Sequence, residues 1–235
     1  MRGPIKNQAL QVLRNRGIRI GTVLDVGVLS GTPELMAYYP QALHILFEPI
    51  VEFNPQIVRS YSRIPHEIVN VAVSDSTGET LLEMYHMVDV PDHPYSHSNV
   101  TSQPTPGRAV RTVPRTTLDD FVRDRDLPEP YFLKIDVDGH ELGVIAGATE
   151  TLKKCAVVMI EVTLEEVPER LAAVAAHGFT LFDLAAPCYY DNAFYNFDAI
   201  FMRTELHERV FAQFGDNFDF AKYSVFAPPR RPAQP

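Results

Sequence analysis

The sequence "DVGVLSG" at residues 25–31 has the composition of a loop that approaches a bound ligand. Gly27 and Gly31 allow a tight turn and a close backbone approach, whereas Thr32 and Pro33 suit the N-cap and first position of a helix. The unpaired amides at such a helix start attract an anionic group. The loop lacks the middle glycine of a dinucleotide fingerprint, which favours a carboxylate over a pyrophosphate as its ligand.

Glu48 is the second residue with a chemical signal, because it ends the apolar segment "LHILFEP" 17 residues beyond Gly31. An acidic residue at this spacing accepts hydrogen bonds from both hydroxyls of a ribose. A carboxylate site beside a ribose site describes S-adenosylmethionine, in which a methionine is joined to adenosine. A nicotinamide dinucleotide site shares the acidic signal, and an ordinary solvated carboxylate at a strand end is the structural alternative.

A second cluster lies in "YFLKIDVDGHELGVIAGA", where a lysine interrupts an apolar strand. Side chains alternate along a strand, so Lys134 and Asp136 point to the same face and approach each other. Asp138 and Glu141 have the spacing of a capping box at the start of the next helix. His140 lies in the first turn of that helix, where it is either a base or an exposed side chain.

These residues need a framework, and apolar strand-like segments alternate with helical patterns along the chain. This alternation predicts an α/β fold in which crossover helices connect a parallel, Rossmann-like sheet. The segments are almost continuously apolar, as expected when helices cover both faces of the sheet. The strands expected in this sheet are residues 21–27, 43–49, 66–75, 131–137, 156–162, 179–184 and 197–204.

Two segments depart from this alternation. Residues 80–87 alternate like a strand after a polar turn, so we expect a hairpin in place of a crossover helix. Residues 88–110 contain four prolines and no apolar periodicity, which predicts a long loop that is either a lid over the substrate or passive. Thr117 then suits an N-cap. We expect one domain over residues 1–215 and a C-terminal tail over 216–235 with a disordered, proline-rich end.

Length and charge restrict the class of protein. The 235 residues, 46% of them hydrophobic, suit one large domain. The net charge of −9 predicts that the protein repels nucleic acid and anionic membrane surfaces. No apolar stretch has the length of a signal peptide core or a membrane span, which predicts a cytoplasmic protein without membrane contact. The oligomeric state is not predicted.

Three ordered motifs make the resemblance specific. The segments "VNVAVSDSTGE", "VPRTTLDDF" and "FLKIDVDGHELGVIAGA" resemble the FkbM family of S-adenosylmethionine-dependent methyltransferases, and the similarity runs from about residue 21 to about residue 203. The resemblance implies the class I methyltransferase fold, a seven-stranded, mostly parallel sheet with helices on both faces and an antiparallel last strand. Val28 and Leu29 replace a small residue and an asparagine of the usual family loop, and Asp138 replaces a glutamate.

Carried over to this sequence, the resemblance places seven residues around S-adenosylmethionine: Asp25, Gly27, Gly31, Glu48, Ser74, Asp75 and Asp136. In this assignment the first loop contacts the methionine end, Glu48 the ribose, and Ser74 and Asp75 the adenine. Asp136 lies beside the sulfonium, where a carboxylate is electrostatically favoured. Glu161 lies at the end of an adjacent strand and faces the acceptor, unless it is solvated or caps a helix.

We predict His140 as the general base with Asp136 as its electrostatic neighbour, because an imidazole titrates near pH 6.5. Asp136 and Glu161 are the alternative bases. Asp136, Asp138, His140 and Glu161 could also hold a divalent ion. We nevertheless expect no metal, because capping explains Asp138 and Glu141.

The leading hypothesis is an O-methyltransferase that acts on a hydroxyl of a small acceptor, such as a sugar or a natural-product intermediate. The alternatives are a nicotinamide-dependent oxidoreductase and a catalytically silent ligand-binding protein. Acceptor specificity is expected in residues 88–110 and around Tyr189, Tyr190, Phe194 and Tyr195, which either stack on the acceptor or pack in the core.

Overall fold

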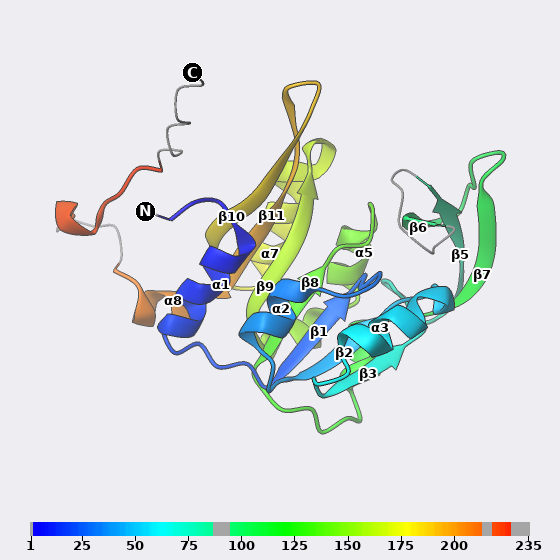
Figure 1. The fold of residues 1–235 in the computed structure, drawn as a ribbon, viewed down its shortest axis with the longest axis horizontal. Coiled ribbons are helices and arrows are strands. Elements are labelled where there is room, and N and C mark those ends of the chain that lie inside the picture. The colour runs from blue at the N-terminus through cyan, green and yellow to red at the C-terminus, as the bar shows by residue number, and fades with distance from the viewer. Residues whose placement is uncertain (1, 87–94, 213–217, 227–235) are drawn as a thin grey trace, which may run out of the picture.

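The computed structural model describes residues 2–86, 95–212 and 218–226 (Figure 1). The α-helices are α1 (Lys6–Asn15), α2 (Pro33–Tyr38), α3 (Asn54–Ser60), α4 (Leu118–Val122), α5 (Glu141–Ala146), α6 (Thr149–Lys153), α7 (Val167–Ala176) and α8 (Thr204–Val210). The strands are β1 (Thr22–Val26), β2 (Leu43–Phe47), β3 (His66–Val69), β4 (Ala72–Val73), β5 (Gly78–Tyr85), β6 (His97–Thr101), β7 (Ala109–Thr116), β8 (Tyr131–Ile135), β9 (Cys155–Thr163), β10 (Phe179–Tyr190) and β11 (Ala193–Arg203). Short 3-10 helices are η1 (Val51–Phe53), η2 (Leu164–Glu166) and η3 (Phe220–Lys222).

The main sheet has seven strands in the order β10-β11-β9-β8-β1-β2-β3. β1 pairs in parallel with β2 and β8, and β8 pairs in parallel with β9. β11 is antiparallel to both β9 and β10, so the last strand runs against the others. The seven-stranded, mostly parallel sheet with a reversed last strand is therefore confirmed.

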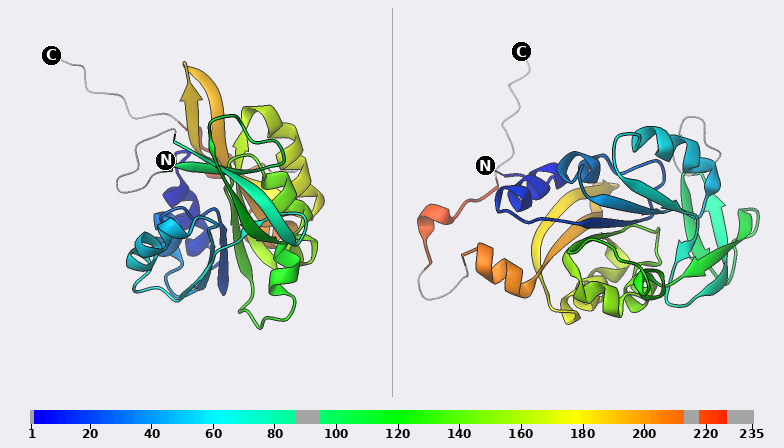
Figure 2. Two further views of the ribbon diagram at one scale, coloured as in Figure 1. Left: turned by 90° about the vertical axis from the view of Figure 1, so that its right-hand side faces the viewer. Right: turned by 90° about the horizontal axis from the view of Figure 1, so that it is seen from below.

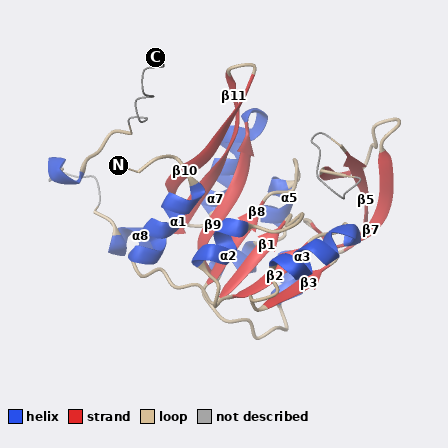
Figure 3. Cartoon of the chain, viewed as in Figure 1, coloured by secondary structure: helices blue, strands red, loops and turns tan. Residues whose placement is uncertain are grey.

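Helices cover both faces of this sheet (Figures 2 and 3). Alternate residues of β1 enter different cores, with Val23 packed against α1 and α2 and Leu24 packed on the opposite face with α4 to α7. All five residues of β1 and all five of β8 are buried. Because neither face meets water, most residues of these strands are apolar, which is the pattern that predicted them, and the exceptions are Thr22, Asp25 and Lys134.

A second, four-stranded sheet in the order β4-β7-β5-β6 lies beyond the β3 edge of the main sheet (Figure 1). The strand expected at 66–75 is divided between the two sheets, as β3 and β4. The chain bends between them, where the Val71 amide donates to the Val69 carbonyl at 3.0 Å and the Asn70 side chain donates to the Glu48 carbonyl at 2.8 Å. The prediction of one continuous strand was wrong because a polar side chain stabilises this bend.

The expected hairpin after β4 was also wrong in its pairing. β5 pairs antiparallel with β6 and β7, whereas β4 pairs in parallel with β7. The prediction of a structureless loop over residues 88–110 was wrong for β6 and the start of β7. Among the described strands β6 pairs only with β5, and as a polar edge strand it lacks the apolar alternation that marks a half-buried strand. Residues 88–94 of the predicted lid lie outside the described residues.

Local signals set several element boundaries. Thr117 is the N-cap of α4 and accepts a hydrogen bond from the Asp120 amide at 2.9 Å, as predicted. Pro33 is the first residue of α2, also as predicted. Of the predicted tail, residues 218–226 are described and include η3. Within the described residues, no helix combines the length and apolar character needed to cross a bilayer.

Candidate active site at the carboxyl ends of the central strands

A pocket lies where β1, β2, β8 and β9 end, and β6 of the second sheet forms its opposite wall. Figure 1 shows β1, β8 and β9 converging on this region, with the β10–β11 hairpin on one side and the second sheet on the other. The polar and acidic residues that line the pocket are Glu48, Ser96, His97, Ser98, Asp136, Asp138 and Glu161. Gly27 and Leu29 contribute the loop after β1.

Gly27 allows the loop after β1 to contact the end of β8. Its φ is +82°, and a Cβ at this position would lie 1.7 Å from the Asp136 carbonyl oxygen. The Gly27 amide donates to the Phe47 carbonyl at 3.1 Å, which fixes the loop to β2 as well. A glycine is therefore required here both for its conformation and for its lack of a side chain. Gly31 also has positive φ, +135°, but does not line the pocket.

Asp25, Lys134 and Asp136 form a chain of charges beneath the pocket. Lys134 Nζ lies 3.3 Å from both Asp25 Oδ1 and Asp136 Oδ2 and donates to the Gly27 carbonyl at 2.7 Å. Burial disfavours the ammonium, yet the two carboxylates outweigh it and raise the pKa of Lys134 above its usual value. The predicted approach of Lys134 and Asp136 is confirmed, and the lysine stays charged.

The structure places Asp25 below the pocket and not on its surface. Its side chain is fully buried, and Oδ2 accepts a hydrogen bond from the Thr32 hydroxyl at 2.6 Å. Thr32 occupies the N-cap position of α2, but its side chain makes no capping bond and holds Asp25 instead. Asp25 therefore holds the start of α2 and Lys134 in position. It would influence a bound ligand indirectly, through Thr32 and Lys134.

Glu48 lines the pocket from the end of β2. Its Oε2 accepts from the Leu29 amide at 2.8 Å, and its Oε1 accepts from the Ile50 amide at 2.9 Å. Burial raises the pKa of Glu48 to about 7, although the two backbone donors favour the charged form. Each carboxylate oxygen retains a second lone pair, so these bonds are compatible with the predicted contact to ribose hydroxyls.

Asp136, Asp138 and Glu161 form one acidic side of the pocket, which we call the carboxylate wall. Asp138 accepts from the Ser98 amide at 3.1 Å, and burial raises its pKa. Burial together with the neighbouring carboxylates raises the pKa of Glu161 to about 8. Glu161 Oε1 also accepts from the Asn196 side chain at 2.7 Å, which orients the carboxyl group. Near pH 7 the carboxyl group of Glu161 therefore keeps its proton in the free pocket, and the wall becomes more negative as pH rises.

Ser74, Asp75 and His140 do not line the pocket. The Ser74 hydroxyl lies 2.9 Å from His140 Nε2 and donates to Asp75 Oδ1 at 3.2 Å. Burial lowers the pKa of His140, so the imidazole is neutral near pH 7. A Cβ on Gly143 would lie 2.4 Å from the His140 ring, which shows how closely the ring packs on α5. The structure therefore brings the predicted base to Ser74 and not to the carboxylate wall.

The same contacts form part of an inter-sheet junction, in which the three family-like motifs meet. The Ser74 amide donates to the Thr116 carbonyl at 2.9 Å, and the Asp119 amide donates to the Gly147 carbonyl at 3.0 Å. A Cβ on Gly147 would lie 2.1 Å from the Ser74 carbonyl oxygen. The motifs thus join the second sheet to α4, α5 and α6.

The predicted capping box was wrong, because His140 and not Asp138 occupies the N-cap position of α5. Asp138 has a positive φ of +54°, which turns its side chain toward β6. Glu141 is fully buried, with its Oε2 2.8 Å from the Arg170 guanidinium and its Oε1 accepting from the Val137 amide at 3.1 Å. The glutamate thus closes the loop before α5 and pairs with α7.

The sequence pointed to residues 88–110 as a possible lid over the substrate but missed that His97 and Ser98 of this segment belong to a strand, β6, that lines the pocket. No spacing rule connects residues that far from the glycine loop, and the Asp138–Ser98 bond exists only after the second sheet has formed. The hairpin aromatics were left open between two roles. Tyr189, Tyr190 and Tyr195 are exposed, by 66%, 79% and 44%, so they do not pack in the core.

Among the described residues, no group of three or more His, Cys, Asp or Glu side chains is arranged to hold a metal ion. The set proposed from the sequence, Asp136, Asp138, His140 and Glu161, divides between the carboxylate wall and the Ser74 contact.

Comparison with known proteins agrees with this architecture. The model of the methyltransferase FkbM domain matches residues 25–211. The chain belongs to the FkbM methyltransferase family. Hexuronic acid methyltransferase AglP of Haloferax volcanii is 26% identical over 140 residues, which cover 59% of this chain and 54% of that relative. The match thus spans about half of the relative's length.

Two solved structures illustrate the more distant similarities. An rRNA methylase from Streptococcus thermophilus aligns with a TM-score of 0.44 and 12% identity, covering 86% of this chain and 98% of the other. N-methyltransferase NodS from Bradyrhizobium japonicum, solved with S-adenosylhomocysteine, aligns with a TM-score of 0.42 and 8% identity, covering 84% and 85%.

S-adenosylmethionine is the cofactor of this family, and the pocket fits its chemistry. The cofactor carries a net positive charge, and no lysine or arginine occurs among the described residues that line the pocket. Phe47, Val73 and Leu82 supply an apolar surface of the kind that a purine requires. Glu48 and Asp136 lie on the pocket surface. Their contacts with the ribose and the sulfonium stay predictions, as does the contact of Ser74 and Asp75 with adenine.

Proposed function

We propose that this methyltransferase transfers a methyl group to a hydroxyl of a small acceptor of the sugar or natural-product type. The observation that carries the proposal is Glu161, a carboxylate on the pocket surface with a pKa raised to about 8. A base of this strength matches proton removal from a hydroxyl near neutral pH. The hexuronic acid named for the relative AglP supports a carbohydrate-like acceptor.

Glu161 is a better candidate for the general base than His140 because of position. Glu161 lines the pocket and is oriented by Asn196, whereas His140 faces Ser74 outside it. S-adenosylmethionine supplies an electrophilic methyl group on a cationic sulfur. Glu161 would accept the proton of the acceptor hydroxyl, and S-adenosylmethionine, when bound, would supply the methyl group and keep the electron pair on its sulfur.

The remaining pocket residues position the reactants. Gly27 and Asp136 bring the first loop against the end of β8, and Glu48 holds the loop through the Leu29 amide. Orientation of the acceptor oxygen about 3 Å from the methyl carbon accounts for much of the rate enhancement in such displacements. We assign acceptor contacts to the exposed tyrosines of the β10–β11 hairpin, Tyr189, Tyr190 and Tyr195.

The charge of the pocket supports a small acceptor over a nucleic acid. The carboxylate wall would repel phosphates, and the chain as a whole carries a net charge of −9. The incomplete glycine pattern and the family membership leave no support for a nicotinamide-dependent oxidoreductase.

The test compares Glu161→Gln with His140→Ala in a cofactor-turnover assay with a panel of neutral and acidic glycosides and hydroxylated natural products. We expect Glu161→Gln to lower turnover by about 10²–10⁴-fold and to remove the activity increase between pH 6.5 and 8.5. His140→Ala should retain turnover within about tenfold. Full activity of Glu161→Gln would exclude it as the base, and absence of turnover by the wild type would favour a silent ligand-binding protein.

A further inference from the structure

The carboxylate wall faces a ligand whose charge changes during the reaction. S-adenosylmethionine has a net charge of +1, because its sulfonium adds to a zwitterionic amino acid, whereas S-adenosylhomocysteine is neutral. We propose that Asp136, Asp138 and Glu161 make this pocket selective for the cationic cofactor over its neutral product, so that loss of the sulfonium charge promotes product release. The proposal rests on the cofactor assignment and not on the acceptor or on the identity of the base.

The geometry concentrates negative charge at one side of the pocket. Asp136 comes from the end of β8, Asp138 from the loop that follows, and Glu161 from β9. Asp138 is tied to the opposite wall by the Ser98 amide, and Glu161 is tied to β11 by Asn196. The three carboxylates therefore cannot all turn away from a ligand that occupies the pocket.

Among the described residues, Asp136 is the wall carboxylate that has a basic partner, Lys134, whereas no ion pair compensates Asp138 or Glu161. Lys134 bridges Asp25 and Asp136, and Arg170 bridges Glu141 and Glu166. Lysine and arginine are absent from the described residues that line the pocket, and the sequence of residues 87–94 contains neither. A cationic ligand in the pocket thus supplies positive charge that the described lining residues do not provide.

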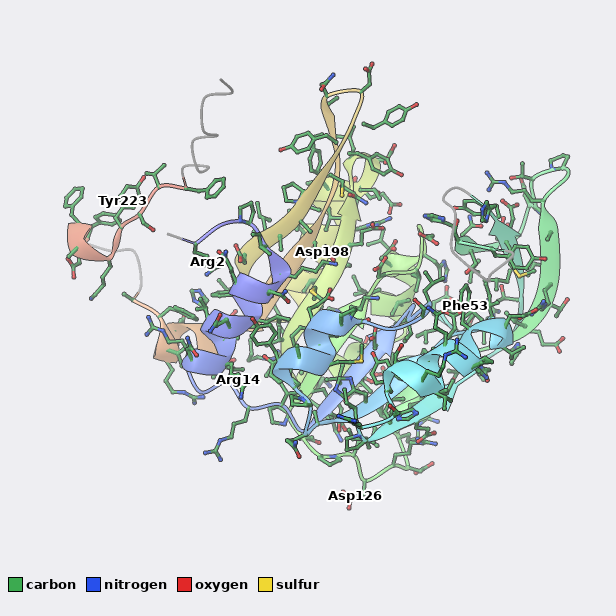
Figure 4. The ribbon with its side chains drawn as sticks, viewed as in Figure 1. Arg2, Arg14, Phe53, Asp126, Asp198 and Tyr223 are labelled. Carbon is green, nitrogen blue, oxygen red and sulfur yellow. The ribbon has the colours of Figure 1, made fainter. Side chains whose placement is uncertain are left out.

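The neighbours of Glu161 make this balance sensitive to pH. The charged or titratable groups on the surrounding elements are Lys6 of α1, Glu48 after β2, His97 of β6, Lys134 of β8, Asp136 and Asp138 after β8, Glu141 of α5, Arg170 of α7 and Asp198 of β11. Figure 4 labels Asp198, which pairs with Lys6 at 2.9 Å. The raised pKa of Glu161, about 8, means that the free pocket retains a proton near pH 7, which a bound cation would displace.

The experiment is titration calorimetry of the wild type with S-adenosylmethionine, S-adenosylhomocysteine and sinefungin at pH 6.0 and 8.5. Sinefungin carries an amine in place of the methylated sulfur, so it tests charge without a transferable methyl group. We expect the two cations to bind at least about tenfold more tightly than S-adenosylhomocysteine at pH 8.5, and this preference to shrink at pH 6.0. Titrations at pH 7.5 in phosphate and in Tris should show proton release for the cations and less for the product.

Variants identify the carboxylates. The double variant Asp138→Asn, Glu161→Gln should reduce the preference for the cations about tenfold or more while leaving affinity for S-adenosylhomocysteine within about threefold. The matched control is Glu79→Gln, which removes an exposed carboxylate at the other end of β5 from Met84, the residue paired with Ser98. It should leave the preference unchanged.

Three results would overturn the proposal. The first is equal or tighter binding of S-adenosylhomocysteine by the wild type at pH 8.5, and the second is an unchanged preference in the double variant. The third is failure of all three ligands to bind, which would also remove the cofactor assignment. Methyl transfer to an unexpected acceptor would leave the charge preference intact, so failure of the acceptor proposal is distinguishable from failure of this one.

Discussion

Replacement of Gly27 by alanine tests whether the contact between the first loop and β8 determines stability. The new Cβ would lie 1.7 Å from the Asp136 carbonyl oxygen, in a region where contacts below 3.0 Å are essentially never found. The two segments must therefore separate by more than 1 Å (3.0 minus 1.7). That movement disrupts the hydrogen bond from the Asp136 amide to the Val26 carbonyl, now 3.0 Å, and the bond from Lys134 to the Gly27 carbonyl, now 2.7 Å.

The magnitude follows from these losses. A left-handed conformation costs a non-glycine residue about 1–2 kcal/mol. The backbone bond adds about 1 kcal/mol and the bond to the buried ammonium about 1.5–3 kcal/mol. We therefore expect Gly27→Ala to lower the free energy of unfolding by about 3–6 kcal/mol, a large part of the stability of an ordinary domain.

Gly17→Ala is the matched control, because Gly17 has a similar φ of +76° but no atom lies within 4 Å of the position that its Cβ would occupy. It should cost only about 1–2 kcal/mol. Urea unfolding followed by circular dichroism measures both changes, with an unchanged denaturant slope as evidence that the same cooperative unit unfolds. Equal destabilisation by the two substitutions would refute the contact argument and leave backbone conformation as the whole effect.

Two further predictions concern buried charge. Because the pKa of Glu161 is raised to about 8 from 4.5, the folded protein binds a proton that the unfolded chain lacks between these pH values, so wild-type stability falls as pH rises through this window. Glu161→Gln should therefore stabilise the protein increasingly from pH 5 to pH 8, by about 1–3 kcal/mol after allowance for partial solvent screening, and parallel stability curves would contradict the shift. Arg170→Met should lower the unfolding free energy by about 3–5 kcal/mol because it leaves Glu141 buried without its partner, and addition of Glu141→Gln should recover part of this loss in the same urea assay. No recovery in the double variant would show that packing of Arg170, and not charge, is what matters.

Local sequence rules predicted the parts of the site that depend on neighbouring residues. Strand alternation placed Lys134 beside Asp136, and the side-chain chemistry of Thr117 predicted the start of α4. The order of apolar segments predicted the main sheet, because strands buried on both faces must be apolar whatever their partners are. Glu48 was found for the same reason, since it directly follows such a strand.

The parts that sequence reasoning missed depend on contacts between distant segments. His140 was expected at the reacting centre because it follows β8, but its orientation depends on Ser74, 66 residues earlier. The polar strand β6 has no apolar alternation, so nothing local indicated that Ser98 would bind Asp138. Thr32 has a side chain that suits an N-cap, yet its hydroxyl donates to the buried carboxylate of Asp25 and makes no capping bond.

The inter-sheet junction brings together the two ends of the segment that contains β5, β6 and β7, so this segment is an insertion that could be exchanged as a unit. The segment that contains β5, β6 and β7 begins after Ser74, at the end of β4, and ends at Thr116, and these two residues are joined by a 2.9 Å hydrogen bond. Because the two ends of this segment are adjacent, it closes a loop, and the entropic cost of closing a loop increases only slowly with the number of its residues. Segments of different length and sequence could therefore replace residues 79–114 without moving β1, β8 or β9. Such grafts would replace Ser98, which binds Asp138, and Leu82 of the apolar surface, while the loop after β1 and the ends of β8 and β9 keep their places. A redesign of acceptor choice in this segment must therefore retain these two contacts.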